Sequence, residues 1–263
     1  MSALRVYVEG IGVWSPQLAD FAALGRVLAG ATPTPFTAHP GATVLPANER
    51  RRAPQSVLLA VEVAQQAVAM SRREAATLQC VFASADGDQA TTDYMCTTLA
   101  QTPTELSPTR FHNSVHNAPV GYWTIAIGCH AASTAVAAQR ASFGAGLLEA
   151  ASQVLGEQQP VLLVCSDTAG TGPLREVTGC QQAFGCALVL APDRGAAALA
   201  RLELQLTPPR PDTPLDEPLA TWRANNASGP ALALLALLTQ SAGRCQVAAA
   251  AKLGLQIDME SVV

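Results

Sequence analysis

The sequence predicts an α/β fold in which helices cover a central, largely parallel β-sheet. Short apolar runs that are typical of buried strands alternate with longer segments whose apolar residues recur at helical spacing. Of the 263 residues, 49% are hydrophobic but only 5% are aromatic, so small aliphatic side chains must fill the layers. A chain of this length can bury a substantial core, and residues 1–263 are expected to form a single domain.

The predicted strands are short, rich in aliphatic residues and bounded by turn residues. The first covers residues 5–13, and Gly10 and Gly12 are interpreted as a turn that leads to Ser15 and Pro16. Five further strands are predicted at 77–84, 133–138, 161–165, 184–190 and 197–206. Residues 246–257 are expected to supply one or two terminal strands.

The predicted helices show apolar residues at a spacing of three to four positions. They cover 19–28, 55–70, 90–100, 118–128, 141–155 and 230–238. Pro119 suits a first helical turn, and Gly156 is expected to end the helix that begins at Ala141. The proline-rich segments 32–46 and 208–218 are predicted to be connectors, and 103–117 is predicted to be irregular.

The charge pattern argues against a nucleic-acid-binding protein. The net charge is −4, and the basic run Arg50-Arg51-Arg52 is best interpreted as solvated surface. The N-terminus lacks a signal-peptide pattern, and the most apolar stretch, 229–238, is too short to span a membrane. The seven cysteines form no C-x-x-C pair, which favours free thiols in a reducing compartment. We therefore expect a cytoplasmic protein without a membrane span.

Several motifs follow one another in an order that resembles the β-ketoacyl-ACP synthases. The segment Val8 to Pro16 (V-E-G-I-G-V-W-S-P) resembles the V-x-G-x-G-x-x-S-P start of that family. The segment Phe184 to Leu190 (F-G-C-A-L-V-L) resembles its G-A-G-A-x-V-L-E strand. Between them, further similar segments lie at 45–52, 81–85, 107–111 and 117–121. The resemblance covers roughly residues 4 to 206 and is carried by the ordered combination rather than by any one motif.

The resemblance implies a thiolase-like fold, with a five-stranded mixed sheet covered by helices. Because the chain stops well short of a full ketosynthase, its second half is expected to be shortened after about residue 195. Enzymes of this family hold a nucleophilic Cys between a strand and the N-terminus of a long helix, where the helix dipole lowers the thiol pKa. The family motif is T-A-C-x-S, about twenty residues before a buried strand.

The spacing test places Arg140 in the register of that Cys. Arg140 lies 21 residues before Val161, whereas Cys129, in the tempting string G-C-H-A-A-S, lies 32 residues before it. Ser142 then matches the Ser of the motif, and a slip of one residue would put Gln139 in the nucleophile position instead. An Arg at a helix N-terminus is unfavourable unless its side chain turns to a carboxylate, a carbonyl or an anion.

The histidines provide a second test. The family's decarboxylation step uses two later His residues, or a His and an Asn. All four histidines of this chain (His39, His112, His116 and His130) lie before residue 131. The chain therefore resembles the chain-length factors, ketosynthase-like subunits in which another residue, commonly Gln, replaces the Cys. Short members of that group accompany ketosynthases in aryl-polyene and type II polyketide systems.

This resemblance implies a non-catalytic subunit of a ketosynthase complex in fatty-acid-like or polyketide chain assembly. It would form a heterodimer with a full-length ketosynthase, shape the partner's acyl tunnel, meet the acyl carrier protein through the complex, and need no cofactor or metal. The alternative is a divergent acyltransferase or condensing enzyme that uses Cys129 as its nucleophile.

The resemblance also implies where the partner binds. Condensing enzymes pair the strand before the nucleophile across a two-fold axis. Here that strand would be Ser133, Thr134, Ala135, Val136, Ala137 and Ala138. The segment 108–117 should lie beside it, and Phe111 and His112 are the candidates for closing or lengthening the acyl tunnel.

Three other patterns are interpreted as structural. His112 and His116 would share a face if they were helical, but the sequence suggests no third metal ligand. Ser166-Asp167 lacks the G-x-S-x-G context of a hydrolase and any later His. The segment 169–172 (A-G-T-G) lacks the Lys of a phosphate-binding loop.

Overall fold

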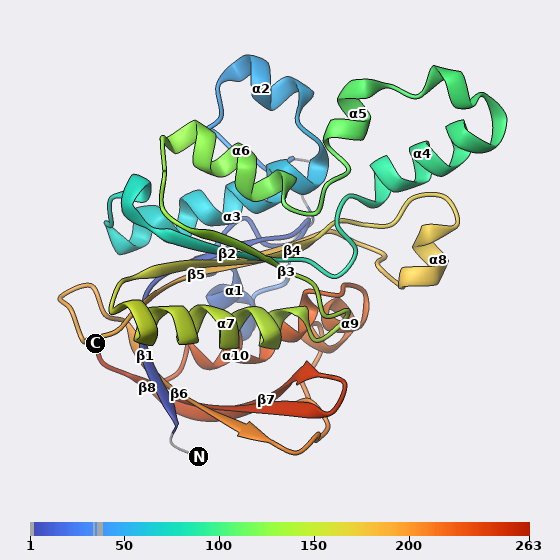
Figure 1. Ribbon diagram of the computed structural model, residues 1–263. Coiled ribbons are helices and arrows are strands. Elements are labelled where there is room, and N and C mark those ends of the chain that lie inside the picture. Colours follow the sequence, from blue (N-terminus) through green and yellow to red (C-terminus); the bar gives the residue numbers. More distant parts are fainter. Residues whose placement is uncertain (1–2, 34, 36–38) are drawn as a thin grey trace.

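The computed structural model describes residues 3–33, 35 and 39–263, and the strands of this part join one mixed sheet (Figure 1). The order of the sheet is β3-β2-β4-β5-β1-β6-β8-β7. The strands are β1 (Leu4–Trp14), β2 (Gln79–Ala83), β3 (Ser133–Val136), β4 (Val161–Asp167), β5 (Phe184–Ala191), β6 (Ala200–Thr207), β7 (Ala242–Ala250) and β8 (Leu253–Ser261).

Helices cover both faces of the sheet, as predicted. They are α1 (Phe21–Leu28), α2 (Ala47–Arg52), α3 (Gln55–Ser71), α4 (Gln89–Gln101), α5 (Pro108–His112), α6 (Ala118–Ile127), α7 (Ser142–Glu157), α8 (Leu174–Thr178), α9 (Leu219–Ala224) and α10 (Leu232–Leu237). The sequence did not predict the short helices α2, α5, α8 and α9. Gly156 lies inside α7 rather than ending it, because the helix continues to Glu157 and ends at Gln158 with a φ of 53°.

The prediction of a largely parallel sheet is wrong, whereas the mixed sheet that the resemblance implies is confirmed, with more strands than the five expected. Only β2 pairs in parallel, with β3 and with β4, and the remaining neighbours in the described part are antiparallel. Strands buried on both faces are uniformly apolar in either direction, so their sequence does not reveal how they pair. Residues 200–261 add β6, β8 and β7 to the same sheet, which brings it to eight strands in the described part of the chain.

The long strand β1 joins the two parts of this sheet. Its residues Tyr7 to Trp14 pair with β5, and its residues Leu4 to Val8 pair with β6. The sheet bends there, so that β6, β8 and β7 pass on the far side of α7 and α10 (Figure 1). Helix α7 consequently has β-sheet on both sides: a Cβ on Gly144 would stand 2.1 Å from Ala248 O of β7, and one on Gly146 would stand 3.0 Å from the Cβ of Ala83 in β2.

Gly10 and Gly12 do not form a turn, contrary to the sequence-based interpretation. Both lie inside β1, where α3 crosses the strand in close contact. A Cβ on Gly10 would stand 2.0 Å from Ala67 O, and one on Gly12 would stand 2.0 Å from Val63 O. The two glycines are therefore required for the close approach of a helix and not for a change in chain direction.

The outward face of β6, β8 and β7 carries charged side chains that pair across the strands. Arg201 forms an ion pair with Glu260 at 2.6 Å, and Arg5 pairs with Glu203 at 2.9 Å. Such a face is compatible with water, so this end of the bent sheet needs no further layer of apolar structure to cover it.

The first prediction concerns the contact between β1 and α3. Gly12→Ala would place a methyl group against the backbone oxygen of Val63, which cannot move without shifting α3. We expect a loss of roughly 3 kcal/mol of stability and a fall in Tm of about 5–10 °C in differential scanning calorimetry. Gly25→Ala in α1 is the control: nothing lies within 4 Å, and the variant should be up to about 1 kcal/mol more stable. Equal Tm values for the two variants would contradict the tight contact.

Candidate functional site

The candidate site lies at the carboxyl ends of the parallel strands β2, β3 and β4. Ser84 follows β2, Gln139 follows β3, and Asp167 is the last residue of β4. Parallel strands bring these ends to one edge of the sheet, which is where α/β proteins usually place their binding sites. Helix α7 begins at the same edge, because it follows β3 directly.

The turn between β3 and α7 is sharp, and its unusual backbone position is Gln139, with a φ of 51°. Ser142 stabilises this turn from inside the protein. Its fully buried hydroxyl donates to Gln139 O at 2.7 Å and accepts from Ala138 N at 2.9 Å. A strained residue at a strand-to-helix turn is typical of nucleophile positions. The structure therefore places Gln139 at the tip of the turn, with Arg140 immediately after it.

The side chain of Arg140 turns away from the helix N-terminus toward backbone carbonyls. Its Nη2 donates to Arg223 O at 2.7 Å and to Asn226 O at 3.4 Å. Burial raises the pKa of the neighbouring Asp86, and the positive charge of Arg140 opposes that rise. The guanidinium is thus used to hold residues 223–226 against the turn.

Asp167 is the centre of a buried polar cluster at the end of β4. Its carboxylate accepts from the hydroxyls of Ser84 (2.7 Å) and Ser228 (2.6 Å) and from the backbone N–H groups of Ala85 (2.9 Å) and Asp86 (3.2 Å). Burial raises the pKa of Asp167 to about 6, although these hydrogen bonds favour the charged form. The cluster connects β2, β4 and the segment that contains Ser228.

Residues 225–229 cover this edge of the sheet. The Asn226 side chain donates to Asp167 O (2.8 Å) and to Gln182 O (2.7 Å), and its oxygen accepts from Ser228 N (2.8 Å). Asn226 and Ser228 are both fully buried. Neither residue was predicted from the sequence, because the partners Asp167 and Gln182 of the Asn226 side chain lie 59 and 44 residues away along the chain.

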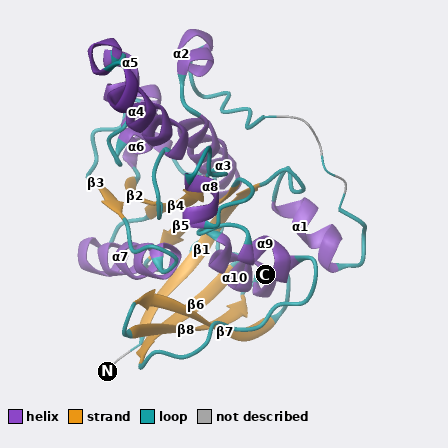
Figure 2. Ribbon diagram, turned by 90° about the vertical axis from the view of Figure 1, so that its right-hand side faces the viewer, coloured by secondary structure: helices purple, strands orange, loops and turns teal. Residues whose placement is uncertain are grey.

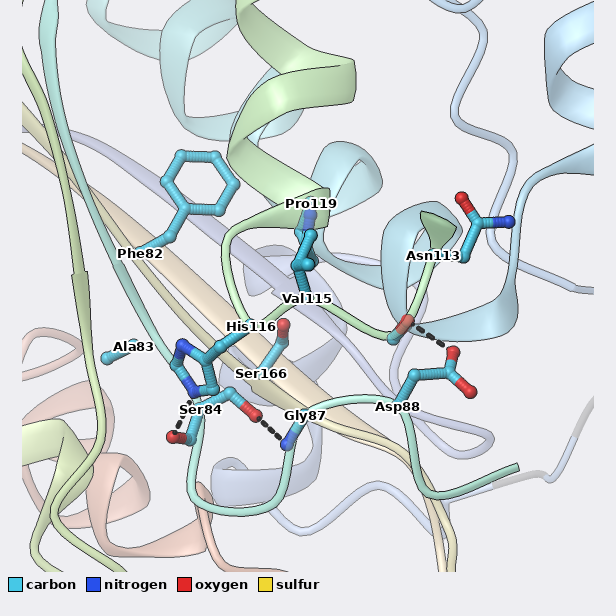
Figure 3. A pocket seen from close by; sticks show the side chains of 11 residues that line it. Phe82, Ala83, Ser84, Gly87, Asp88, Asn113, Val115, His116, Pro119 and Ser166 are labelled. Carbon is cyan, nitrogen blue, oxygen red and sulfur yellow. Dashed lines mark hydrogen bonds between the residues drawn. The ribbon is translucent and has the colours of Figure 1, made fainter. Parts of the chain in front are cut away.

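The cavity beside Ser84 is small. Figure 3 shows His116, Ser84 and Ser166 around it, with Nε2 of His116 lying 3.1 Å from Ser84 O. Its volume of about 20 Å³ is enough for roughly one water molecule. No organic substrate fits into this cavity in the conformation observed.

Cys129 lies at the opposite end of the parallel strands. Its buried thiol donates to Leu78 O at 3.4 Å, just before β2 begins, and the thiol of Cys80 donates to the same oxygen. The structure therefore does not bring Cys129 to the turn at Gln139. Cys180 is nearer to the site, with its thiol 3.7 Å from Asp86 Oδ2, but burial raises its pKa and makes it a poor nucleophile.

The residues expected at an interface lie on one side of the molecule. Strand β3 is an edge of the sheet, and Ser133 and Ala135 are exposed along it. Phe111, on α5, is 57% exposed, and His112 lines a neighbouring groove. Helix α5 ends at His112, so His112 and His116 do not share a helical face. Among the described residues, no group of three or more His, Cys, Asp or Glu side chains could hold a metal ion.

The two edges of the sheet differ in how their backbone groups are used. The edge strand β7 is bonded by the connector before α9: Thr213 N donates to Gln246 O (2.9 Å), and Ala248 N donates to Asp212 Oδ1 (2.9 Å). Nothing in the described part of the chain covers the outer side of β3 in this way. A free edge of this kind is suited to pairing with another chain.

Also within the described residues, no helix has the length and apolar character needed to cross a bilayer.

Comparison with known proteins agrees with the resemblance. A family model described as β-ketoacyl synthase, N-terminal domain, matches residues 30–253. No curated protein sequence matches significantly.

Solved structures of ketosynthase complexes share the fold. A chain of the ketosynthase (ApeO) in complex with its chain length factor (ApeC) from Xenorhabdus doucetiae is 22% identical, with a TM-score of 0.71 over 98% of this chain and 99% of that chain. A chain of AntDE:AntF, a type II PKS acyl-carrier protein in complex with its ketosynthase bound to the hexaketide, is 15% identical, with a TM-score of 0.75 and full coverage of both (100% and 100%). The ishigamide ketosynthase/chain length factor is 17% identical, with a TM-score of 0.53 over 72% of this chain and 59% of that chain. The predicted thiolase-like fold is thereby confirmed.

The second prediction concerns the ionisation of Asp167. Its pKa is raised in the folded protein, so its contribution to stability is full below about pH 4 and is lost as the pH rises through about 6. The pKa shift of about two units corresponds to roughly 3 kcal/mol in the free energy of unfolding.

Asp167→Asn removes this pH dependence and adds a constant loss of stability from weaker hydrogen bonding. Urea unfolding between pH 4 and 7 should therefore show a flatter profile for Asp167→Asn than for the wild type, and Asp193→Asn, an exposed control, should keep the wild-type slope. Parallel profiles for Asp167→Asn and the wild type would contradict the assignment.

The third prediction separates the cysteines. Cys96 is exposed on α4, whereas Cys129 is buried with its thiol donating to a backbone oxygen. Under native conditions iodoacetamide should alkylate Cys96 first and leave Cys129 largely unmodified, as read by peptide mass spectrometry. Fast and selective modification of Cys129 would instead support a nucleophilic role for it.

Proposed function

This chain belongs to the β-ketoacyl synthase family, and within that family we propose that it is a non-catalytic, chain-length-factor-like subunit that pairs with an active ketosynthase. One observation carries the proposal. Gln139 and Arg140 stand at the strand-to-helix turn after β3, which the sequence register matches to the family's nucleophile position, and Arg140 binds the chain's own residues 223–226 there.

Neither side chain at this turn can perform the family's chemistry. An amide and a guanidinium do not attack a thioester, because neither offers the thiolate or alkoxide that acyl transfer requires. Beside the turn, Asn226 and Ser228 are fully buried, and the cavity next to Ser84 holds only about one water molecule. In this conformation a substrate would find no nucleophile at the turn.

The position of Cys129 weakens the alternative of a divergent acyltransferase. Its thiol is buried at the amino end of the strands and satisfied by Leu78 O. It also follows the carboxyl end of α6, whereas an activated cysteine in such enzymes commonly stands at a helix N-terminus.

The free edge β3 supports pairing with a ketosynthase. The backbone of β3 alternates its bonding direction: Cys80 N donates to Ala132 O, and Ser84 N donates to Val136 O. Residues 132, 134 and 136 therefore bond β2, and the backbone groups of Ser133 and Ala135 point to the free side. Small side chains on this strand allow a second backbone to approach closely.

In the proposed complex the ketosynthase supplies the catalytic Cys and His residues. The acyl carrier protein meets this chain only through that complex. This chain would contribute the far wall of the acyl tunnel through α5 (Figure 2). Phe111, on this helix, is exposed. The size of the side chains at 111 and 112 would then limit the length of the product. The structural likeness to a chain of a ketosynthase–chain length factor complex and to a chain of a type II PKS complex supports a type II polyketide-like setting. The aryl-polyene setting is what the sequence resemblance implies.

The fourth prediction tests the pairing. Ala135→Pro removes a backbone N–H on the free side of β3 and spares the bonds to β2. Co-expressed with the ketosynthase encoded in the same gene neighbourhood, the wild type and the control Ala135→Ser should co-purify with it, and Ala135→Pro should not. Circular dichroism should show that all three variants are folded.

The same complex tests the absence of catalysis. Radiolabelled acyl-ACP should label the ketosynthase and not this chain. Covalent acylation of this chain, or a failure of the wild type to bind the ketosynthase at all, would overturn the proposal.

A further inference from the structure

An apolar groove lies between the segment that enters α2, the loop after α5, and α6. It is a hollow of about 480 Å³, lined mainly by Leu45, Val115, Tyr122 and Ile125, with Glu49 and His112 among its polar residues. Ile125 is 83% exposed and Val115 is 51% exposed. An apolar centre with polar groups around it is the usual composition of a protein interface.

In the sequence, the helix that lines the groove lies close to β3, the free edge strand of the sheet. Helix α6 carries Tyr122 and Ile125, and only residues 128–132 separate its end from β3. Helix α6 also contacts β2, the neighbour of β3 in the sheet (Figure 1), so a surface that covers β3 can extend toward α6. Phe111, which directly precedes the groove residue His112 on α5, is also exposed.

The area that a stable complex requires indicates what occupies this groove. Stable interfaces bury about 1,200–2,000 Å² in total, whereas a strand of four residues is only about 13 Å long. Strand pairing at β3 cannot supply this area alone, so a partner held there must bury neighbouring surface as well. The groove is apolar, exposed and next in the chain to β3.

We propose that this groove forms the second half of the interface with the ketosynthase and takes an apolar side chain or loop of that partner. The inference rests on the proposed function. In this complex, the energetic centre of the interface is formed by Ile125, Val115 and Tyr122. Strand β3 fixes the register of the two chains. The polar residues Glu49 and His112 lie at its margin and contribute little affinity.

The test uses two β-branched aliphatic residues of similar exposure, one in the groove and one outside it. Ile125→Glu places a charge in the groove, and Val177→Glu places one on α8, where Val177 is 80% exposed and does not line the groove. Both side chains already face solvent, so neither variant should change the Tm. By surface plasmon resonance with the purified ketosynthase, Ile125→Glu should raise the Kd at least 10-fold, and Val177→Glu should bind like the wild type.

A second variant fills the groove without adding charge. A Cβ on Gly121 would meet nothing within 4 Å, so Gly121→Leu should be accepted by the fold while its side chain occupies the space meant for the partner. It should also raise the Kd at least 10-fold.

The outcomes separate this inference from the proposed function. Wild-type affinity in both groove variants, with binding lost in Ala135→Pro, would overturn the groove and leave the pairing intact. If the groove variants instead break a homodimer seen by size-exclusion chromatography, and ketosynthase affinity is unchanged, the occupant is a second copy and the proposal is wrong. If the wild type never binds the ketosynthase, both proposals fail together.

Discussion

The enclosure of helix α7 between two parts of one sheet is the constraint on which the rest of the structure depends. The helix can approach β7 and β2 only because Gly144 and Gly146 have no side chains to obstruct them. Its buried face continues with Leu147, Ala150, Ala151 and Val154, so apolar contact holds it along its length. A helix fixed in this way cannot shift along its axis, and its first residue, Ser142, therefore defines where the turn at Gln139 must be.

The site follows from that fixed turn. An Arg at the N-terminus of a long helix meets the positive end of the helix dipole, so it is stable only when strong acceptors compensate. Arg140 finds them in the carbonyls of Arg223 and Asn226, and the Asn226 side chain in turn binds Asp167 O and Gln182 O. The same contacts that satisfy the charge bring residues 223–228 over the strand ends. Stabilising Arg140 and covering the strand ends are thus one arrangement, which supports the proposed non-catalytic role of the turn.

Much of the fold and part of the candidate site could be predicted from the sequence, and the errors of those predictions have physical reasons. Periodicity located the buried helices and most strands, and the register of 21 residues to Val161 pointed to the turn that the structure shows at 139–140. The predicted parallel direction of the strands was wrong because β5 is buried along its whole length. It carries no polar alternation that would mark it as antiparallel. Gly10 and Gly12 were misinterpreted because a glycine needed for close packing looks the same in sequence as one needed for a turn. Asn226 was missed because its partner Asp167 lies 59 residues away, and no local pattern encodes such a contact.

The bend at β1 also decides which edge of the sheet remains free. By turning β6, β8 and β7 under α7, it brings the connector before α9 alongside β7, where Thr213 and Asp212 bond the strand's backbone. The outward face of the same strands is covered with ion pairs, such as that between Arg201 and Glu260, and is stable in water.

At the other end of the sheet, β3 has small side chains, an open backbone edge and an apolar groove beside it. A free edge next to exposed apolar surface is a hazard for a protein that acts alone, because it promotes uncontrolled association. The molecule protects one edge thoroughly and leaves the other open, and that asymmetry is best explained if the open edge is normally covered by a specific partner.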